Sequence, residues 1–322
     1  MGQRTVAPGD VLLDRYRIAE WIGSGSSGLV MRAVDLAQSR VVAVKIRHGH
    51  AEGSRKDNSR FLREIQAISA LRGPHVAQLF DFGALPDGTP YMVMEFLEGP
   101  DLRKVLASNG RLDPRHAVDY ILQACDALVE AHALGIVHRD IKPANLMLAK
   151  HADGRQIVKV VDFGSAKAPG MDLTRSGSLV GTPLYMSPEQ MHGARGVDLR
   201  CDIWSIGAVL YHLVEGRPPF DAQHFMDLAA QVSSAQQAAM VVAPELAPVV
   251  ERCLKKRPRD RFTNIRDLAR ALAPFASRPS GLAIAQVPVR SARSRPGRDL
   301  LVFIGVFVIV CGMTLAILAF AN

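Results

Sequence analysis

Two segments in the middle of the chain carry side chains that suit chemistry on phosphate groups. The first, residues 138–145, contains Asp140, Lys142 and Asn145, and the second contains Asp162 directly before a Phe-Gly pair. Carboxylate and amide oxygens are hard donors of the kind that Mg²⁺ prefers. Because phosphoryl transfer requires mainly positioning and the neutralisation of charge on phosphates, these residue types fit that reaction.

A glycine-rich segment near the N-terminus could cradle phosphates. Residues 23–28 fit the pattern G-x-G-x-x-G, whose small residues let backbone N–H groups approach a phosphate closely. Dinucleotide-binding folds use the same pattern, but there it opens into a helix. Here residues 29–34 are rich in β-branched residues and alternate as a strand does. The sequence therefore predicts a glycine-rich hairpin over residues 22–30, although a solvated turn would have the same composition.

Lys45 ends an apolar run, residues 42–45, that predicts a strand. A lysine inside such a run needs an anionic partner. Glu64, in the predicted helical stretch 60–71, is the candidate partner. Taken singly, a glutamate in that position would more often be a charge on a helix surface.

Together these segments resemble the eukaryotic-like (Hanks-type) serine/threonine protein kinases over residues 16–275, in the family's order. The glycine loop fits the family pattern fully. Three further elements depart from it by one conservative residue each, with Val44, Ile141 and Ser187 standing where the family has Ile, Leu and Ala. The wording of residues 181–190 is most similar to the bacterial membrane-anchored members.

The resemblance implies a site for ATP and Mg²⁺, with Mn²⁺ as an alternative metal. Lys45, held by Glu64, would bind the α and β phosphates. Asn145 and Asp162 would be the metal ligands, and Asp140 would orient the acceptor hydroxyl and accept its proton. The implied catalytic residues are Asp140, Lys45, Lys142, Asn145 and Asp162. The implied nucleotide-binding residues are Ile22, Gly23, Ser24, Gly25, Ser26, Ser27, Gly28, Val30, Ala43, Lys45, Glu64, Glu95 and Leu97.

The same resemblance assigns supporting roles to residues outside the catalytic set. His138 would be structural, and Met94 would be the gatekeeper beside the adenine site. Asp202 resembles the helix residue that braces the catalytic loop, and Arg261 is expected to pair with Glu189.

Lys142 and the Gly-Thr pair at residues 181–182 mark serine/threonine rather than tyrosine kinases in this family. The implied activity is transfer of the ATP γ-phosphoryl group to serine and threonine hydroxyls of protein substrates, in membrane-linked signalling. A kinase that acts on small molecules is a rival interpretation. The segment 182–189, which shapes the peptide site in protein kinases, argues against it.

The main alternative from another class is a pseudokinase scaffold that binds nucleotide or partner proteins without catalysis. Such a protein would normally lack one of the three residues Lys45, Asp140 and Asp162, and all three are present.

Regulation by phosphorylation is expected on the segment 162–189. In the family, an arginine in the position of Arg139 meets a phosphate on this segment, and the added charge can order a mobile loop. The candidate sites, modified by the enzyme itself, are Thr174, Ser176 and Ser178.

The distribution of charge argues against a nucleic-acid partner. The formal net charge is +8, but residues 277–299 contain five arginines and one aspartate and so hold half of that excess. The remainder of the chain has no basic bias of the kind that binds DNA or RNA. The four cysteines form no C-x-x-C pair, which disfavours a disulfide framework or a structural zinc site.

Residues 300–320 form an apolar run without charge. As a helix of about 1.5 Å rise per residue it would reach roughly 31 Å, enough to cross a bilayer core. A buried core helix is the alternative, although core helices usually keep a polar face. Arginines precede the run, so a single-pass membrane protein is expected, with a cytoplasmic kinase domain and the C-terminus across the membrane. Gly312 and Ala316 could let two such helices approach in a homodimer.

The predicted fold class is α+β: a bilobal protein-kinase fold, with a β-rich N-lobe containing one helix and a mainly helical C-lobe, plus one C-terminal transmembrane helix. Strands are predicted at residues 41–44 and 91–94, and helices at 117–134, 202–215 and 246–254. The predicted domains are an N-terminal extension (1–15), a kinase domain (16–275, with lobes of about 16–97 and 98–275), a basic juxtamembrane linker (276–299) and the transmembrane helix (300–320).

Overall fold

The computed structural model describes residues 6–25, 28–47, 65–66, 68–151, 154–163, 183–193 and 197–277. All of them belong to one of the two units into which the chain divides, residues 1–284. The predicted linker beyond residue 277 and the predicted helix 300–320 lie outside these ranges, as do Ser26, Ser27 and Glu64.

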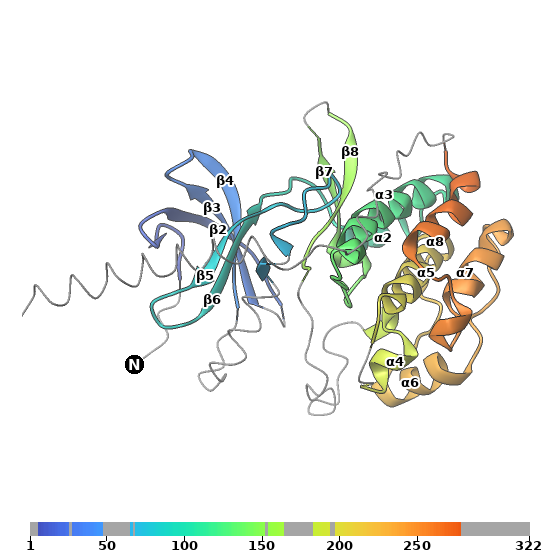
Figure 1. Ribbon diagram of the computed structural model, residues 1–322. Coiled ribbons are helices and arrows are strands. Elements are labelled where there is room, and N and C mark those ends of the chain that lie inside the picture. Colours follow the sequence, from blue (N-terminus) through green and yellow to red (C-terminus); the bar gives the residue numbers. More distant parts are fainter. Residues whose placement is uncertain are drawn as a thin grey trace, which may run out of the picture. The chain divides into compact units, whose positions relative to one another are not determined.

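The N-terminal part forms one six-stranded antiparallel sheet (Figure 1). Its strands are β1 (Val11–Leu12), β2 (Tyr16–Gly25), β3 (Gly28–Asp35), β4 (Arg40–Ile46), β5 (Leu79–Ala84) and β6 (Pro90–Glu95), in the order β1-β2-β3-β4-β6-β5. Apolar residues from one face, such as Met31, Val42 and Val93, form a separate small core. Gly28 pairs with Gly25 across the β2–β3 turn. A Cβ at Gly28 would lie 2.3 Å from the Ile46 carbonyl oxygen, so this position requires glycine.

The C-terminal part is mainly helical and carries a second, two-stranded sheet (Figure 1). Its strands are β7 (Leu146–Lys150) and β8 (Gln156–Val160). Its α-helices are α2 (Leu102–Asn109), α3 (Pro114–Ala133), α4 (Pro188–Met191), α5 (Arg200–Glu215), α6 (Phe225–Ser234), α7 (Ala247–Cys253) and α8 (Ile265–Leu272). Short 3₁₀ turns are η1 (Pro143–Asn145), η2 (Pro183–Tyr185), η3 (Pro244–Leu246), η4 (Pro258–Asp260) and η5 (Ala273–Phe275).

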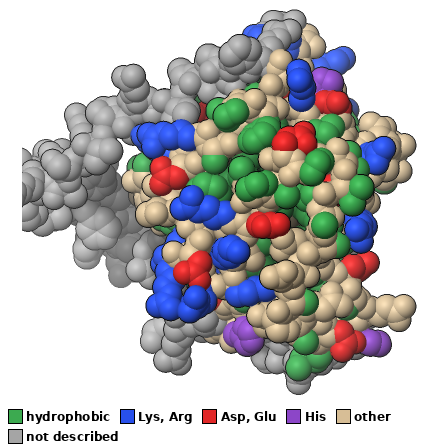
Figure 2. Space-filling view, turned by 90° about the vertical axis from the view of Figure 1, so that its right-hand side faces the viewer, with side chains coloured by type: hydrophobic (Ala, Val, Ile, Leu, Met, Phe, Trp, Pro, Cys, Tyr) green, Lys and Arg blue, Asp and Glu red, His purple; other side chains and the backbone are tan. Residues whose placement is uncertain are grey.

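Helix α5 forms the centre of the helical lobe. Thirteen of its 16 residues are buried, because apolar side chains occur on every side of it. Gly207 lets α7 pack closely, since a Cβ there would lie 2.3 Å from the Cβ of Cys253. On the face of the molecule shown in Figure 2, acidic and basic side chains are interspersed with apolar ones.

The sequence predicted the fold well within the described residues. Strand β3 directly follows the glycine turn, which confirms the hairpin and rules out the helix that a dinucleotide-binding fold would have there. The three helices predicted in the second lobe correspond to α3, α5 and α7, with ends displaced by a few residues. No helix in the part of the chain that the structure describes is both long and apolar enough to span a membrane.

Candidate functional site

The segment 138–145 brings three of the predicted catalytic residues into direct contact. The Lys142 Nζ lies 2.8 Å from Oδ2 of Asp140. The Asn145 Nδ2 donates to the Asp140 carbonyl oxygen at 2.7 Å and to the Asp140 carboxylate at 3.2 Å. The side chains of Asp140 and Lys142 remain partly exposed, at 29% and 24%. The carboxylate is thus held in place yet open to a substrate.

Lys45 and Asp162 meet although 117 positions separate them in the sequence. The Lys45 Nζ lies 2.7 Å from Oδ1 of Asp162. The lysine side chain is only 5% exposed, so its charge requires this anionic neighbour. The structure thus gives Lys45 an acidic partner, Asp162, that was not predicted for it from the sequence. The predicted partner, Glu64, lies outside the described residues.

A backbone hydrogen bond links the segment that carries Asn145 to the segment that carries Asp162. The Val161 N–H donates to the Asn145 carbonyl oxygen at 3.0 Å, directly before Asp162. Because the Asn145 amide nitrogen binds Asp140, the amide oxygen of Asn145 is turned away from Asp140. An amide oxygen and a carboxylate on adjoining segments are ligands suited to Mg²⁺. Among the described residues there is no group of three or more His, Cys, Asp or Glu side chains that could hold a metal ion.

Asp202, on the first turn of α5, braces the catalytic loop. Its carboxylate accepts hydrogen bonds from the backbone N–H groups of His138 (2.9 Å) and Arg139 (2.8 Å). It also lies 2.8 Å from Nε2 of His132, on α3. Burial alone would raise the pKa of the Asp202 carboxyl, but the hydrogen bond from His132, the electrostatic interactions with His132 and His138 and the hydrogen bond from the His138 N–H outweigh this and hold the pKa below its usual value. The bracing role predicted for Asp202 agrees with this geometry.

His138 is buried and its ring is fully used in packing and hydrogen bonding. The Nε2 atom lies 2.9 Å from the carbonyl oxygen of Val161. The ring packs against Phe163, with 4.7 Å between the ring centroids. The histidine therefore joins the catalytic loop to the segment that carries Asp162, and its predicted structural role agrees with these contacts.

Two residues of the site adopt left-handed backbone conformations that are unusual outside glycine. The φ angles of Arg139 and Asp162 are 64° and 63°. Such a conformation costs about 1–3 kcal/mol and persists only where the surroundings impose it. At Arg139 two hydrogen bonds impose this conformation. Its backbone N–H donates to Asp202, and its carbonyl oxygen accepts from the Gln190 side chain at 2.7 Å.

A buried ion pair anchors the helix that begins at residue 188. The Arg261 guanidinium donates to both carboxylate oxygens of Glu189, at 2.7 and 2.8 Å. Its remaining donors reach the carbonyl oxygens of Arg200, Lys255 and Lys256. The pairing predicted for these two residues is present, and the fully buried arginine has no unused donor group to stabilise.

Most of the predicted nucleotide-binding residues lie in strands β2, β3, β4 and β6 of the six-stranded sheet, Leu97 follows β6, and Ser26, Ser27 and Glu64 lie outside the described residues. In β2 and β3, Gly23 pairs with Val30, and Val30 in turn pairs with Lys45. In β4, Ala43 lies opposite Met94. Ile68, Met94, Asp162 and Phe163 line one small cavity together, which places the predicted gatekeeper beside the segment that carries Asp162.

Sequence reasoning missed the side-chain role of Glu95. Its carboxylate binds Lys159 Nζ at 2.8 Å and the backbone N–H of Gln78 at 3.2 Å. The Glu95 N–H donates to the Gln78 carbonyl oxygen at 2.8 Å, so this group is engaged within the fold. Lys159 sits between two valines in β8, and the argument used for Lys45, a lysine inside an apolar run, would have identified it.

Comparisons with known proteins agree with this geometry. Residues 16–272 match the family model described as protein kinase domain. The serine/threonine-protein kinase PknB of Mycolicibacterium smegmatis is 39% identical over 263 residues, which cover 78% of this chain and 41% of that protein. The serine/threonine-protein kinase pkn3 of Myxococcus xanthus is 32% identical over 310 residues, which cover 89% of this chain and 56% of that protein. The chain thus spans roughly half the length of these curated relatives.

The fold also matches solved structures. The crystal structure of the Mycobacterium tuberculosis PknI kinase domain aligns with a TM-score of 0.67 and 25% sequence identity. The alignment covers 84% of this chain and 99% of that structure. The two-lobed arrangement of a β-sheet and a helical part is therefore shared.

Replacing Asp202 tests the brace directly. The variant Asp202→Asn keeps the shape but loses the charge and one acceptor oxygen, so at least one of three buried donors becomes unpaired. We expect the free energy of unfolding to fall by about 1–3 kcal/mol. Chemical denaturation of the purified chain measures this change.

The matched control is Asp198→Asn, because Asp198 binds Arg200 in an ion pair whose carboxylate is 45% exposed. Its loss should cost less than about 1 kcal/mol. Equal effects of the two substitutions would contradict a special role for Asp202.

Proposed function

Because the chain belongs to the protein kinase family, we propose that it transfers the γ-phosphoryl group of ATP to serine and threonine hydroxyls of proteins. The observation that carries the proposal is that Asn145 links two ion pairs, because its side chain binds Asp140 of the Lys142–Asp140 pair and its carbonyl oxygen binds Val161, directly before Asp162 of the Lys45–Asp162 pair. A pseudokinase that had lost catalysis would have no need to keep both pairs in this geometry.

Each residue has a role that its position supports. Lys45 keeps N–H donors beyond the one engaged by Asp162, and these can bind phosphate oxygens. Asp162 and Asn145 would hold Mg²⁺, which when bound neutralises charge on the phosphates. Asp140 orients the acceptor hydroxyl and takes its proton, while Lys142 holds the Asp140 carboxylate and faces the transferred group.

The activity is tested by incubating the purified full chain with labelled ATP, Mg²⁺ and a generic protein substrate. We expect Asp140→Asn, Lys45→Met and Asp162→Asn each to lower phosphate incorporation by about 10²-fold or more, because each removes a positioning or charge-stabilising group. Asp260→Asn, at an exposed ion pair, is the control and should retain activity. Undiminished incorporation by the Asp162→Asn variant would disprove the assignment.

Autophosphorylation of the segment 162–189 is the proposed regulation, with Thr174, Ser176 and Ser178 as the sites. These three residues lie outside the described ranges. Arg139 supports the proposal, because its buried Nε has no hydrogen-bond partner among the described residues and could receive an anion.

Peptide mass mapping after incubation with Mg-ATP checks this regulation. We expect phosphate on one or more of the three residues in the wild-type chain and none in Asp140→Asn. A fully active preparation without phosphate on this segment would rule it out.

We also propose that residues 300–320 anchor the chain in a membrane, with the kinase domain on the cytoplasmic side. The apolar run is long enough to span a bilayer, and the five arginines of residues 277–299 precede it. Gly312 and Ala316 could bring two such helices together in a dimer.

Alkaline extraction of membranes from cells that express the chain tests the anchor. The full chain should stay in the pellet, and a chain ending at residue 277 should be released into the supernatant. Release of both would refute the anchor. Cross-linking of the full chain and of Gly312→Leu in the same membranes tests the dimer, which should weaken in the variant.

A further inference from the structure

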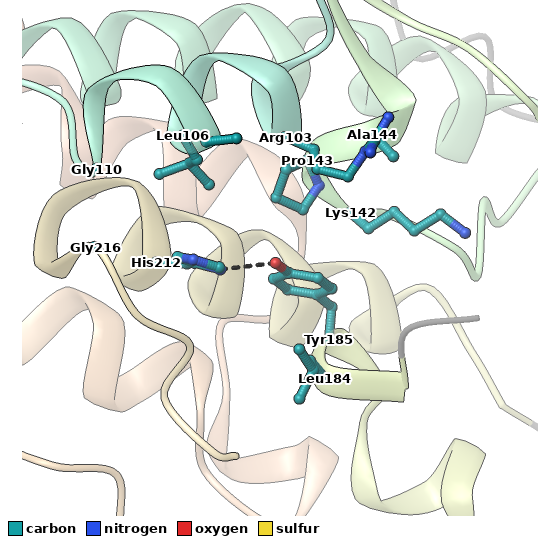
Figure 3. Close-up of a pocket in the computed structure, with 11 residues that line it drawn as sticks. Arg103, Leu106, Gly110, Lys142, Pro143, Ala144, Leu184, Tyr185, His212 and Gly216 are labelled. Carbon is teal, nitrogen blue, oxygen red and sulfur yellow. Dashed lines mark hydrogen bonds between the residues drawn. The ribbon is translucent and has the colours of Figure 1, made fainter. Parts of the chain in front are cut away.

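A cavity of about 360 Å³ lies beside the catalytic loop, between α2, η1, η2 and α5 (Figure 3). Its size is within the range of about 300–1,000 Å³ that is typical of ligand-binding pockets. Carbon-only side chains supply most of the lining: Leu106 and Ala107 from α2, Pro143 and Ala144 from the catalytic loop, and Leu184 from η2.

One side of the cavity is formed by Tyr185 and His212, which bind each other. The Tyr185 hydroxyl lies 2.7 Å from Nδ1 of His212, as the dashed line in Figure 3 shows. The two rings are nearly parallel, at 16°. Burial lowers the pKa of His212, and the more distant Asp221 only partly opposes this. A neutral imidazole with Nδ1 as the acceptor therefore fits the hydrogen bond that the tyrosine donates.

The two cationic side chains that line the cavity already have acidic partners. The Lys142 Nζ binds Asp140 at 2.8 Å, and the Arg103 guanidinium lies 3.3 Å from Asp101. Among the lining residues that the structure describes, none carries a carboxylate. A basic side chain entering the cavity would therefore find no carboxylate among the described lining residues to pair with. An acidic side chain would have to compete with Asp140 for Lys142 and with Asp101 for Arg103.

We propose that this cavity binds an apolar side chain of the protein substrate, within a few residues of the acceptor serine or threonine. The inference rests on the proposed kinase function and adds the kind of substrate to it. Lys142, Pro143 and Ala144 line the cavity and directly follow Asp140 in the catalytic loop. A peptide whose hydroxyl reaches Asp140 therefore passes the mouth of the cavity.

The expected preference follows from the apolar area that is removed from water. Burial of a leucine, methionine or phenylalanine side chain should raise kcat/KM by roughly 10- to 100-fold over glutamine, glutamate or arginine at the same position. Because the described lining offers no carboxylate to a buried cation, lysine and arginine should be the poorest residues at this position.

The test measures kcat/KM of the full chain for peptides that hold one serine and vary a single neighbouring position at a time. One position should show the apolar preference. Two variants at His212, with side chains of nearly equal shape, then test whether this preference arises in the cavity. His212→Gln keeps an acceptor for the Tyr185 hydroxyl without adding charge, and should keep the preference. His212→Glu adds a carboxylate to the cavity, and should shift the preference at that position towards arginine by about tenfold or more.

Ratios between peptides for one variant are independent of how much of that variant is folded. Absence of an apolar preference at every position, a preference for acidic residues, or identical ratios in His212→Gln and His212→Glu would overturn the inference while leaving the kinase function intact. Failure to phosphorylate any peptide or protein would instead remove the kinase function on which the inference rests.

Discussion

The catalytic geometry depends on one buried carboxylate. Asp202 lies at the start of α5, the most deeply buried helix, and its position is therefore fixed by the packing of the whole helical lobe. From there it accepts hydrogen bonds from two consecutive backbone N–H groups of the catalytic loop and contacts His132. The left-handed conformation at Arg139, which would otherwise be unfavourable, is held by this contact. The packing of α5 thereby fixes the backbone of the catalytic loop at His138 and Arg139, directly before Asp140.

Charge also helps to fix the second half of the site. Lys45 comes from a sheet with its own small core, and Asp162 follows the two-stranded sheet of the other lobe. Their ion pair joins the two lobes at the site, and the Lys159–Glu95 pair joins them a second time. In both cases the ion pair compensates for the burial of a lysine within an apolar strand. The two ion pairs act together with the backbone hydrogen bonds between residues 75–77 and Val160 in holding the sheet at the catalytic loop.

Residue patterns predicted most of the local structure and some of the contacts between residues that lie far apart in the sequence. Alternation after Gly28 indicated a strand, and the apolar run before Lys45 indicated a buried lysine, because both patterns report burial directly. The pairs that Asp202 and Arg261 form were expected only through resemblance to a family. His132, Glu95 and the Tyr185–His212 pair were not predicted in these roles. Their partners lie 27 to 70 positions away, and no single segment of sequence contains the information.

The charged residues around the catalytic loop bind one another, and this has a consequence for selectivity. Lys142 is engaged by Asp140, and Arg103 lies beside Asp101, so little charge is left to attract a particular partner. Exposed ion pairs of this kind contribute little energy by themselves. Because their charges are already paired, a nearby cavity gains little from binding another charged side chain. With its charges paired and its lining mostly carbon, the cavity can distinguish substrates chiefly by shape and apolar area. Selectivity near the acceptor hydroxyl would then arise from the same burial of apolar surface that holds α5 in place.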